Sequence, residues 1–179
     1  AGVDAGAGLS ESPSLSFTRS RLQPAHFGWL RGLAPVAVAG GCLLCHGSPR
    51  DDEEYLLRRV GEGGVSDRPD SEVADLLSGF DHRVILCGHD HLPGCRTLPD
   101  GRLAVNPGSV GLPAYRDARP LPHAMSAGSP QARYGILSFS GGNPDFTKVA
   151  VSYDWEKAAA CAAANGRPDW AAWLRSGLA

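Results

Sequence analysis

The segment Gly88-His89-Asp90-His91 directly follows the apolar run Val84–Cys87, and it constrains the fold more than any other part of the chain. Four apolar residues that end at a glycine are typical of a buried strand in a parallel sheet. Open α/β sheets commonly place their functional sites just beyond the carboxyl ends of such strands. Two histidines at i and i+2 of an extended segment project to the same side. The pattern therefore predicts an α/β fold with two imidazoles at one edge of its sheet.

Two further motifs repeat this arrangement of a short apolar run followed by polar residues. Cys42–Cys45 precedes His46, and Leu103–Val105 runs into Asn106, the first residue of the sequence Asn-Pro-Gly-Ser-Val-Gly. Neutral imidazole is the commonest side-chain ligand of metals in proteins. Three histidines at strand ends, His46, His89 and His91, can converge on one point. We therefore predict that these three residues are metal ligands.

The rest of the chain shows the alternating helix and strand patterns of a single α/β domain, which we place at residues 20–179. The first residues, 1–19, are rich in glycine, alanine and serine, and we expect a flexible arm there. The segment 112–132 is rich in proline and glycine and predicts a long exposed loop. We expect helices over 25–33, 51–60, 71–80, 154–164 and 168–174, and strands over 36–39, 42–45, 84–87, 103–105, 134–139 and 146–153.

Composition excludes several classes of protein. The net charge is −2 and no cluster of Lys or Arg is present, which argues against nucleic acid as a partner. No apolar run approaches the roughly 20 residues that span a bilayer. Five cysteines, an odd number, argue against a disulfide framework and for a reducing, cytoplasmic location. Cys42 and Cys45 lie in an apolar run, where we expect small buried side chains in preference to a thiolate zinc site.

Three segments together resemble the calcineurin-like metallophosphoesterases, and most of all their small bacterial and archaeal phosphodiesterase-like branch. They are Cys45-His46-Gly47-Ser48-Pro49, Gly88-His89-Asp90-His91-Leu92-Pro93 and Asn106-Pro107-Gly108-Ser109-Val110-Gly111. The resemblance extends from about Leu22 to the C-terminus. It implies an αββα sandwich, of which this chain would form the C-terminal portion. It also implies hydrolysis of phosphate mono- or diesters by metal-activated water, with a small phosphoester as substrate.

The resemblance also assigns roles to individual residues. His46 and His89 correspond to ligands of one metal, and His91 corresponds to a ligand of the other. Asn106, Gly108 and Ser109 correspond to the tight turn beside the site. The family holds two divalent ions, for which Mn, Fe, Zn and Ni suit such ligands. Because members of the family attack with a metal-bound hydroxide, Ser109 is not expected to be a nucleophile, and no residue is assigned as catalytic.

The chain departs from the family by lacking its opening Asp-x-His, Gly-Asp and Gly-Asn-His/x-Asp motifs. Only Asp4 and Glu11 are acidic before His46, and the role of Asp4 stays open. Gly142-Asn143-Pro144-Asp145 matches the Gly-Asn-x-Asp form of the last of these motifs. It lies between two predicted strands, however, and therefore indicates a turn. We therefore expect one metal or none, and weak or no hydrolysis by this chain alone, unless unseen sequence or another chain supplies ligands.

Two alternatives to an enzyme remain. The chain could be a non-catalytic remnant that binds a metal or a partner, including a second copy of itself, through an exposed sheet edge. It could also be a structural zinc module, which would unfold on chelation.

Overall fold

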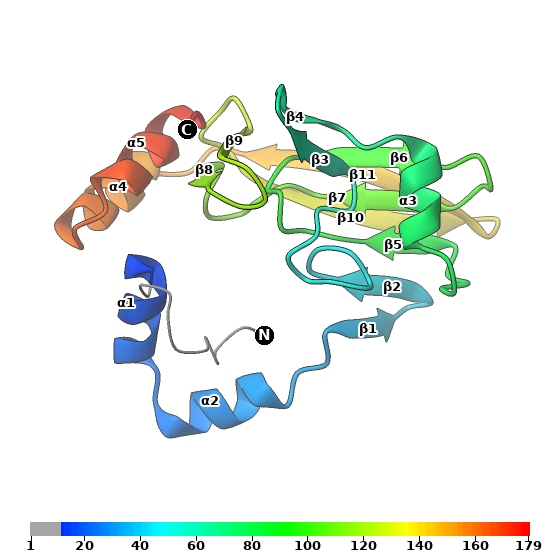
Figure 1. The fold of residues 1–179 in the computed structure, drawn as a ribbon, viewed down its shortest axis with the longest axis horizontal. Helices are drawn as coiled ribbons and strands as arrows, with labels where there is room; N and C mark the ends of the chain where they lie inside the picture. The colour runs from blue at the N-terminus through cyan, green and yellow to red at the C-terminus, as the bar shows by residue number, and fades with distance from the viewer. Residues whose placement is uncertain (1–11) are drawn as a thin grey trace. The chain divides into compact units, whose positions relative to one another are not determined.

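The computed structural model describes residues 12–179, which separate into two units between Pro35 and Val36 (Figure 1). The first unit contains helix α1 (Pro13–Arg21) and helix α2 (Pro24–Arg31). Each begins with a proline, which suits the first helical turn because its missing N–H is not needed there. Helix α1 occupies part of the segment expected to be a flexible arm, and the rest of that expectation, for 1–11, lies outside the described residues.

The second unit is built on a five-stranded sheet with the order β1-β2-β5-β7-β6. Strands β2, β5 and β7 are parallel neighbours, whereas β1 and β6 pair antiparallel at the two edges. The mixed α/β fold predicted from the sequence is confirmed. The strands are β1 (Val36–Ala39), β2 (Cys42–Cys45), β5 (Val84–Leu86), β6 (Gly94–Thr97) and β7 (Leu103–Asn106).

The two faces of this sheet are covered by different elements. Leu43, Ile85 and Ala104 lie side by side in register and belong to a buried cluster with Val73 and Leu77, at helix α3 (Asp70–Leu76). Their neighbours along each strand point to the opposite face. There Cys42, Val84, Leu103 and Val105 pack against Leu137 and Phe146 of the hairpin formed by β10 (Ala132–Ser140) and β11 (Asn143–Val151). Helix, sheet and second sheet thus form successive layers.

The chain ends in two helices, α4 (Trp155–Ala164) and α5 (Pro168–Ser176), both close to their predicted positions. Ala159, Ala171 and Leu174 bury their side chains between the two helices, and Leu112 packs against this cluster. None of the helices in residues 12–179 has the length and apolar character required to cross a bilayer.

Two expectations about secondary structure are wrong. The segment 51–60 is not a helix: it is an irregular loop that leads into a hairpin of β3 (Arg58–Gly61) and β4 (Gly64–Asp67). Tyr55, Leu56 and Leu57 are buried consecutively, which a surface helix does not allow. The supposed exposed loop 112–132 contains a second hairpin, β8 (Ala114–Asp117) and β9 (His123–Ser126), in which His123 and Met125 alternate with exposed residues.

Candidate metal centre

The three motifs singled out from the sequence lie at one edge of the sheet. His46 follows β2, the segment Gly88–His91 follows β5, and Asn106 ends β7. Because these strands are adjacent and parallel, their carboxyl ends meet at the same edge. A backbone hydrogen bond of 2.7 Å, from Gly88 N–H to the carbonyl of His46, joins two of the motifs directly. The rings of His46 and His89 come together with centroids 4.9 Å apart.

Backbone carbonyls fix the protonation pattern of two of the histidines. The Nε2 of His89 lies 3.1 Å from the carbonyl oxygen of Glu53, and the Nδ1 of His91 lies 2.7 Å from that of Leu112. In a neutral ring the nitrogen that faces a carbonyl carries the proton and donates, so the lone pair sits on the other nitrogen. His89 therefore offers Nδ1 as a ligand atom and His91 offers Nε2. Metal-binding histidines are commonly oriented in this way.

The backbone of this segment is not extended, contrary to the sequence-based expectation. His89 and His91 have φ angles of +67° and +60°, in the left-handed region that residues other than glycine seldom occupy. Such conformations cost energy and concentrate at functional sites. The intervening Asp90 is 1% exposed, and its Oδ1 accepts hydrogen bonds from Leu92 N–H and from the Asn106 amide. Asp90 is therefore turned into the protein and is not available as a ligand.

Burial controls the protonation of this segment. Burial lowers the pKa of His89, and the nearby His46 lowers it further; burial likewise lowers the pKa of His91. Both rings are thereby favoured in the neutral form that binds metals. Burial raises the pKa of Asp90 to about 6, because ionisation would place a charge in the interior.

These residues fit the histidine part of a metal site but not a complete two-metal centre. Among residues 12–179, no group of three or more His, Cys, Asp or Glu side chains is gathered as metal ligands. A two-metal hydrolytic centre also needs a carboxylate that bridges the ions, and Asp90 is occupied elsewhere. The assignment of His46, His89 and His91 as ligands stays a prediction.

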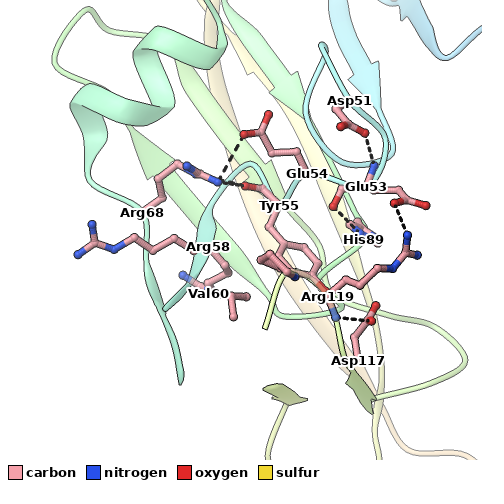
Figure 2. A pocket seen from close by; sticks show the side chains of 12 residues that line it. Asp51, Glu53, Glu54, Tyr55, Arg58, Val60, Arg68, His89, Asp117 and Arg119 are labelled. Carbon is pink, nitrogen blue, oxygen red and sulfur yellow. Dashed lines mark hydrogen bonds and ion pairs between the residues drawn. The ribbon is translucent and has the colours of Figure 1, made fainter. Parts of the chain in front are cut away.

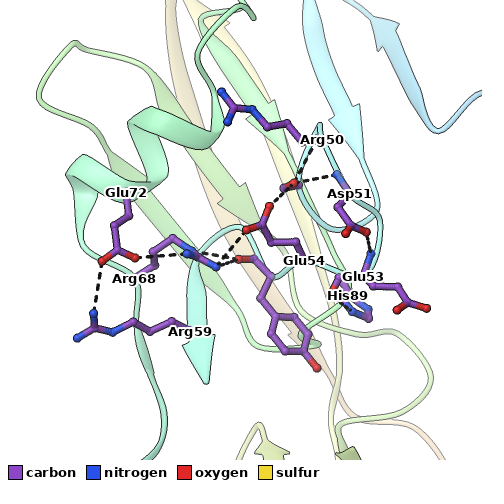
Figure 3. A network of polar contacts seen from close by, with 10 residues as sticks. Arg50, Asp51, Glu53, Glu54, Arg59, Arg68, Glu72 and His89 are labelled. Carbon is purple, nitrogen blue, oxygen red and sulfur yellow. Dashed lines mark hydrogen bonds and ion pairs between the residues drawn. The ribbon is translucent and has the colours of Figure 1, made fainter. Parts of the chain in front are cut away.

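The loop that lies over His89 is held by a network of polar contacts (Figure 3). Ser48 Oγ accepts hydrogen bonds from the N–H groups of Arg50 and Asp51 and donates to the Glu54 carboxylate at 2.8 Å. The guanidinium of Arg68 donates to the carbonyl of Tyr55 at 2.9 Å and forms ion pairs with Glu54 and Glu72. This network fixes the carbonyl of Glu53 and the ring of Tyr55 beside the imidazole.

Gly47, the residue that follows His46, has no side chain, and this lets the backbone of the loop pack closely against it. A Cβ atom at Gly47 would lie 2.6 Å from the carbonyl oxygens of Asp52 and Glu54. Because both are backbone atoms, Gly47→Ala is expected to lower the free energy of unfolding by about 2 kcal/mol, as overpacked sites do. Urea denaturation would measure this, with Gly63→Ala as control, since a Cβ there meets nothing within 4 Å. An equal effect of both substitutions would contradict the argument.

The turn after β7 supports the site through its backbone. Gly108 has φ +91°, and its N–H donates to the Asn106 Oδ1 at 2.9 Å. Ser109 Oγ accepts from the N–H groups of Gly111 and Leu112, which sets the direction of the Leu112 carbonyl that His91 contacts. Ser109 thus stabilises the turn through its side chain.

Two tyrosines and a further histidine at the site were missed in the sequence. Tyr55 stacks on the His89 ring with centroids 4.6 Å apart, and Tyr115 meets the His91 ring edge-on at 4.9 Å. His123 is buried, and its Nε2 accepts a hydrogen bond of 2.9 Å from the Tyr55 hydroxyl. Burial raises the pKa of both tyrosines, so they stay protonated. These residues come from the two segments whose secondary structure was predicted wrongly, and no local pattern marks them.

A cavity of about 440 Å³ opens beside His89 (Figure 2). Tyr55 and His89 form part of its wall, together with four arginines and four acidic residues. Several of these charges are paired: Arg119 forms an ion pair with Glu53 at 3.3 Å, and Arg58 forms one with Asp67. The cavity therefore places polar groups of both signs next to an imidazole.

Comparison with solved structures shows what this fold is similar to. A metallophosphoesterase from Sphaerobacter thermophilus superposes with a TM-score of 0.67 at 22% sequence identity, over 95% of this chain and 72% of that one. Vps29 from Entamoeba histolytica gives a TM-score of 0.32 at 19% identity, over 68% and 63% of the two chains, a likeness too weak to carry an argument. No protein-family model matches the sequence, and no curated protein matches it.

Proposed function

Because the chain has the fold of a metallophosphoesterase, we propose that it contributes the histidine half of a phosphoesterase site. In this proposal His46, His89 and His91 bind divalent metal, with Mn, Fe, Zn or Ni as candidates. A metal at this edge would activate water for attack on a small phosphate mono- or diester. The carboxylate ligands of such a site are not identified, because the described residues contain no group of three or more His, Cys, Asp or Glu side chains placed to hold a metal ion.

The observation that carries this proposal is the paired orientation of His89 and His91. Each ring has one nitrogen hydrogen-bonded to a backbone carbonyl and the other left as a lone-pair donor. Both residues hold this orientation on left-handed backbone, which is costly for a residue with a Cβ. One lone pair on each ring is thereby left for a metal ion, which supports the proposed role of both histidines as ligands.

Metal binding is the most direct test. We expect the purified chain to bind Mn²⁺ or Zn²⁺, and we expect His89→Ala and His46→Ala each to weaken the affinity at least about tenfold, since each removes a ligand. Isothermal titration would give the affinity and the number of ions per chain. His82→Ala is the matched control, because His82 precedes β5 whereas His89 follows it, which puts the two at opposite ends of one strand.

Hydrolysis of a chromogenic phosphodiester, bis-p-nitrophenyl phosphate, in added Mn²⁺ would test the enzymatic part of the proposal on the same samples. Two ions per chain, with turnover that His89→Ala abolishes, would support a phosphoesterase. One ion without turnover would support the non-catalytic alternative, in which the histidines bind metal but do no chemistry. Equal affinity in the wild type and in all three variants would contradict both.

A specific observation favours partner binding as the second candidate function. Strand β1 lies at an edge of the five-stranded sheet, and its Val38 is 59% exposed. Unpaired edge strands are templates for pairing with another chain. Sedimentation analysis would test this candidate: a dimer that Val38→Lys dissociates would support it, and a monomer at all concentrations would contradict it.

A further inference from the structure

We propose that Tyr55, Tyr115 and His123 form a hydrogen-bonded aromatic wall that orients the rings of His89 and His91. These three are positioning residues, and the inference rests on the proposed role of the two histidines as ligands. The wall brings together three separate parts of the chain: the loop after β2, strand β8 and strand β9. We define the aromatic wall as these three side chains.

The hydrogen bonds of the wall run in one direction. His123 Nδ1 lies 2.7 Å from the carbonyl of Leu121, so it carries the proton and Nε2 bears the lone pair. The Tyr55 hydroxyl lies 2.9 Å from that Nε2 and therefore donates to it. The oxygen of Tyr55 is left to accept, and the Tyr115 hydroxyl donates to it at 2.8 Å. His123 is thus the fixed terminal acceptor from which the orientation of both tyrosines follows.

Each tyrosine ring packs against one of the two proposed ligands. Tyr55 lies nearly parallel to His89, with an interplanar angle of 28°, whereas Tyr115 meets His91 at 69°. The hydroxyl–hydroxyl bond joins the two tyrosines, so a rotation of one ring disturbs the contacts of the other. The wall therefore couples the orientation of two imidazoles that belong to different proposed metal positions. Aromatic contacts of this kind stabilise beyond the area they bury.

The wall also supports the strained backbone. The Tyr115 hydroxyl lies 3.1 Å from the carbonyl of His89 and can donate to it in place of Tyr55. That carbonyl belongs to the peptide between His89 and Asp90, directly after the first left-handed residue. When the Tyr115 proton points to this carbonyl and not to Tyr55, it holds the peptide in the orientation that turns Asp90 inward. Removal of the hydroxyl should loosen this peptide while the ring contacts remain.

The test removes the tyrosine hydroxyl groups and keeps the aromatic rings. Tyr55→Phe and Tyr115→Phe keep every ring, and Tyr134→Phe, at an exposed position of β10, is the matched control. Titration of the full chain with Co²⁺, followed by its visible absorption, reports both affinity and coordination geometry. We expect each wall variant to bind Co²⁺ about tenfold more weakly and with an altered spectrum, as is typical when the support of a ligand is removed. The control should match the wild type. His123→Gln, which keeps an acceptor for Tyr55, should retain more affinity than His123→Leu.

A second readout needs no metal. In ¹⁵N-labelled, metal-free protein, the ring nitrogens of His89 should show the Nε2–H tautomer in the wild type and a mixture of tautomers in Tyr115→Phe. Wild-type His89 signals and wild-type Co²⁺ affinity in both wall variants would overturn the inference and leave the proposed function intact. If the wild type bound no Co²⁺, the proposed function would fail. The tautomers would still show whether the wall orients the ring.

Discussion

Asn106→Ala is expected to lower the free energy of unfolding by about 4 kcal/mol. The Asn106 side chain is fully buried and makes three hydrogen bonds. Its Nδ2 donates to the carbonyl of Gly88 and to Asp90 Oδ1, both at 2.7 Å, and its Oδ1 accepts from Gly108 N–H at 2.9 Å. Alanine would leave these partners without a replacement. Each buried group that loses its partner costs about 1–3 kcal/mol. Urea denaturation of the metal-free protein, followed by circular dichroism, would measure the loss.

Asn165→Ala is the matched control for this substitution. Asn165 also donates from Nδ2 to a backbone carbonyl, that of Cys161, but at an exposed helix end. Its removal should cost less than about 1 kcal/mol, as surface substitutions do. Asn106→Asp provides a second check, because it would place a carboxylate beside Asp90. Two adjacent carboxylates resist joint ionisation, so this variant should lose more stability between pH 5 and pH 8 than the wild type does. Comparable losses at positions 106 and 165 would refute the role of Asn106.

The frame of the site could be predicted from the sequence because it rests on local patterns. Continuous apolar runs identified β2, β5 and β7, and β1 was predicted at its observed bounds. Because parallel strands place their carboxyl ends at one edge, the approach of His46 to His89 followed from topology alone. The two faces of the sheet then follow from the alternation of side chains along each strand.

The details of the site could not be predicted because they depend on contacts between distant segments. The acidic start of 51–60 favours a helix, but the burial of Tyr55, Leu56 and Leu57 against the sheet overrides that preference. The aromatic wall joins Tyr55 to partners 60 and 68 residues later in the chain. The left-handed conformation of His89 and His91 likewise has no signal in a sequence read for extended strands.

The stability of the protein is expected to fall by about 2 kcal/mol between pH 4 and pH 6 through Asp90. Burial raises the pKa of this carboxyl to about 6, from an ordinary value of 3.8. Between these two values the folded protein binds more protons at this position than the unfolded chain does. The free energy of unfolding must therefore decrease as pH rises through this range and level off above it. A shift of one pKa unit corresponds to about 1.4 kcal/mol. The charged form is disfavoured because Asp90 Oδ2 is buried and has no hydrogen-bond partner.

Asp90→Asn should remove this dependence, since its Oδ1 can still accept from Leu92 N–H and from Asn106 while the side chain stays neutral. Urea denaturation of the wild type and the variant at pH 4, 5, 6, 7 and 8 would give the difference in stability at each pH. We expect the variant to gain on the wild type by about 2 kcal/mol between pH 4 and pH 6. Because His89 and His91 titrate in both proteins, their effect on stability largely cancels when the two free energies of unfolding are subtracted. Asp81→Asn, at an exposed position, should show no such gain. A parallel pH profile for wild type and Asp90→Asn would mean that the buried carboxyl ionises without cost.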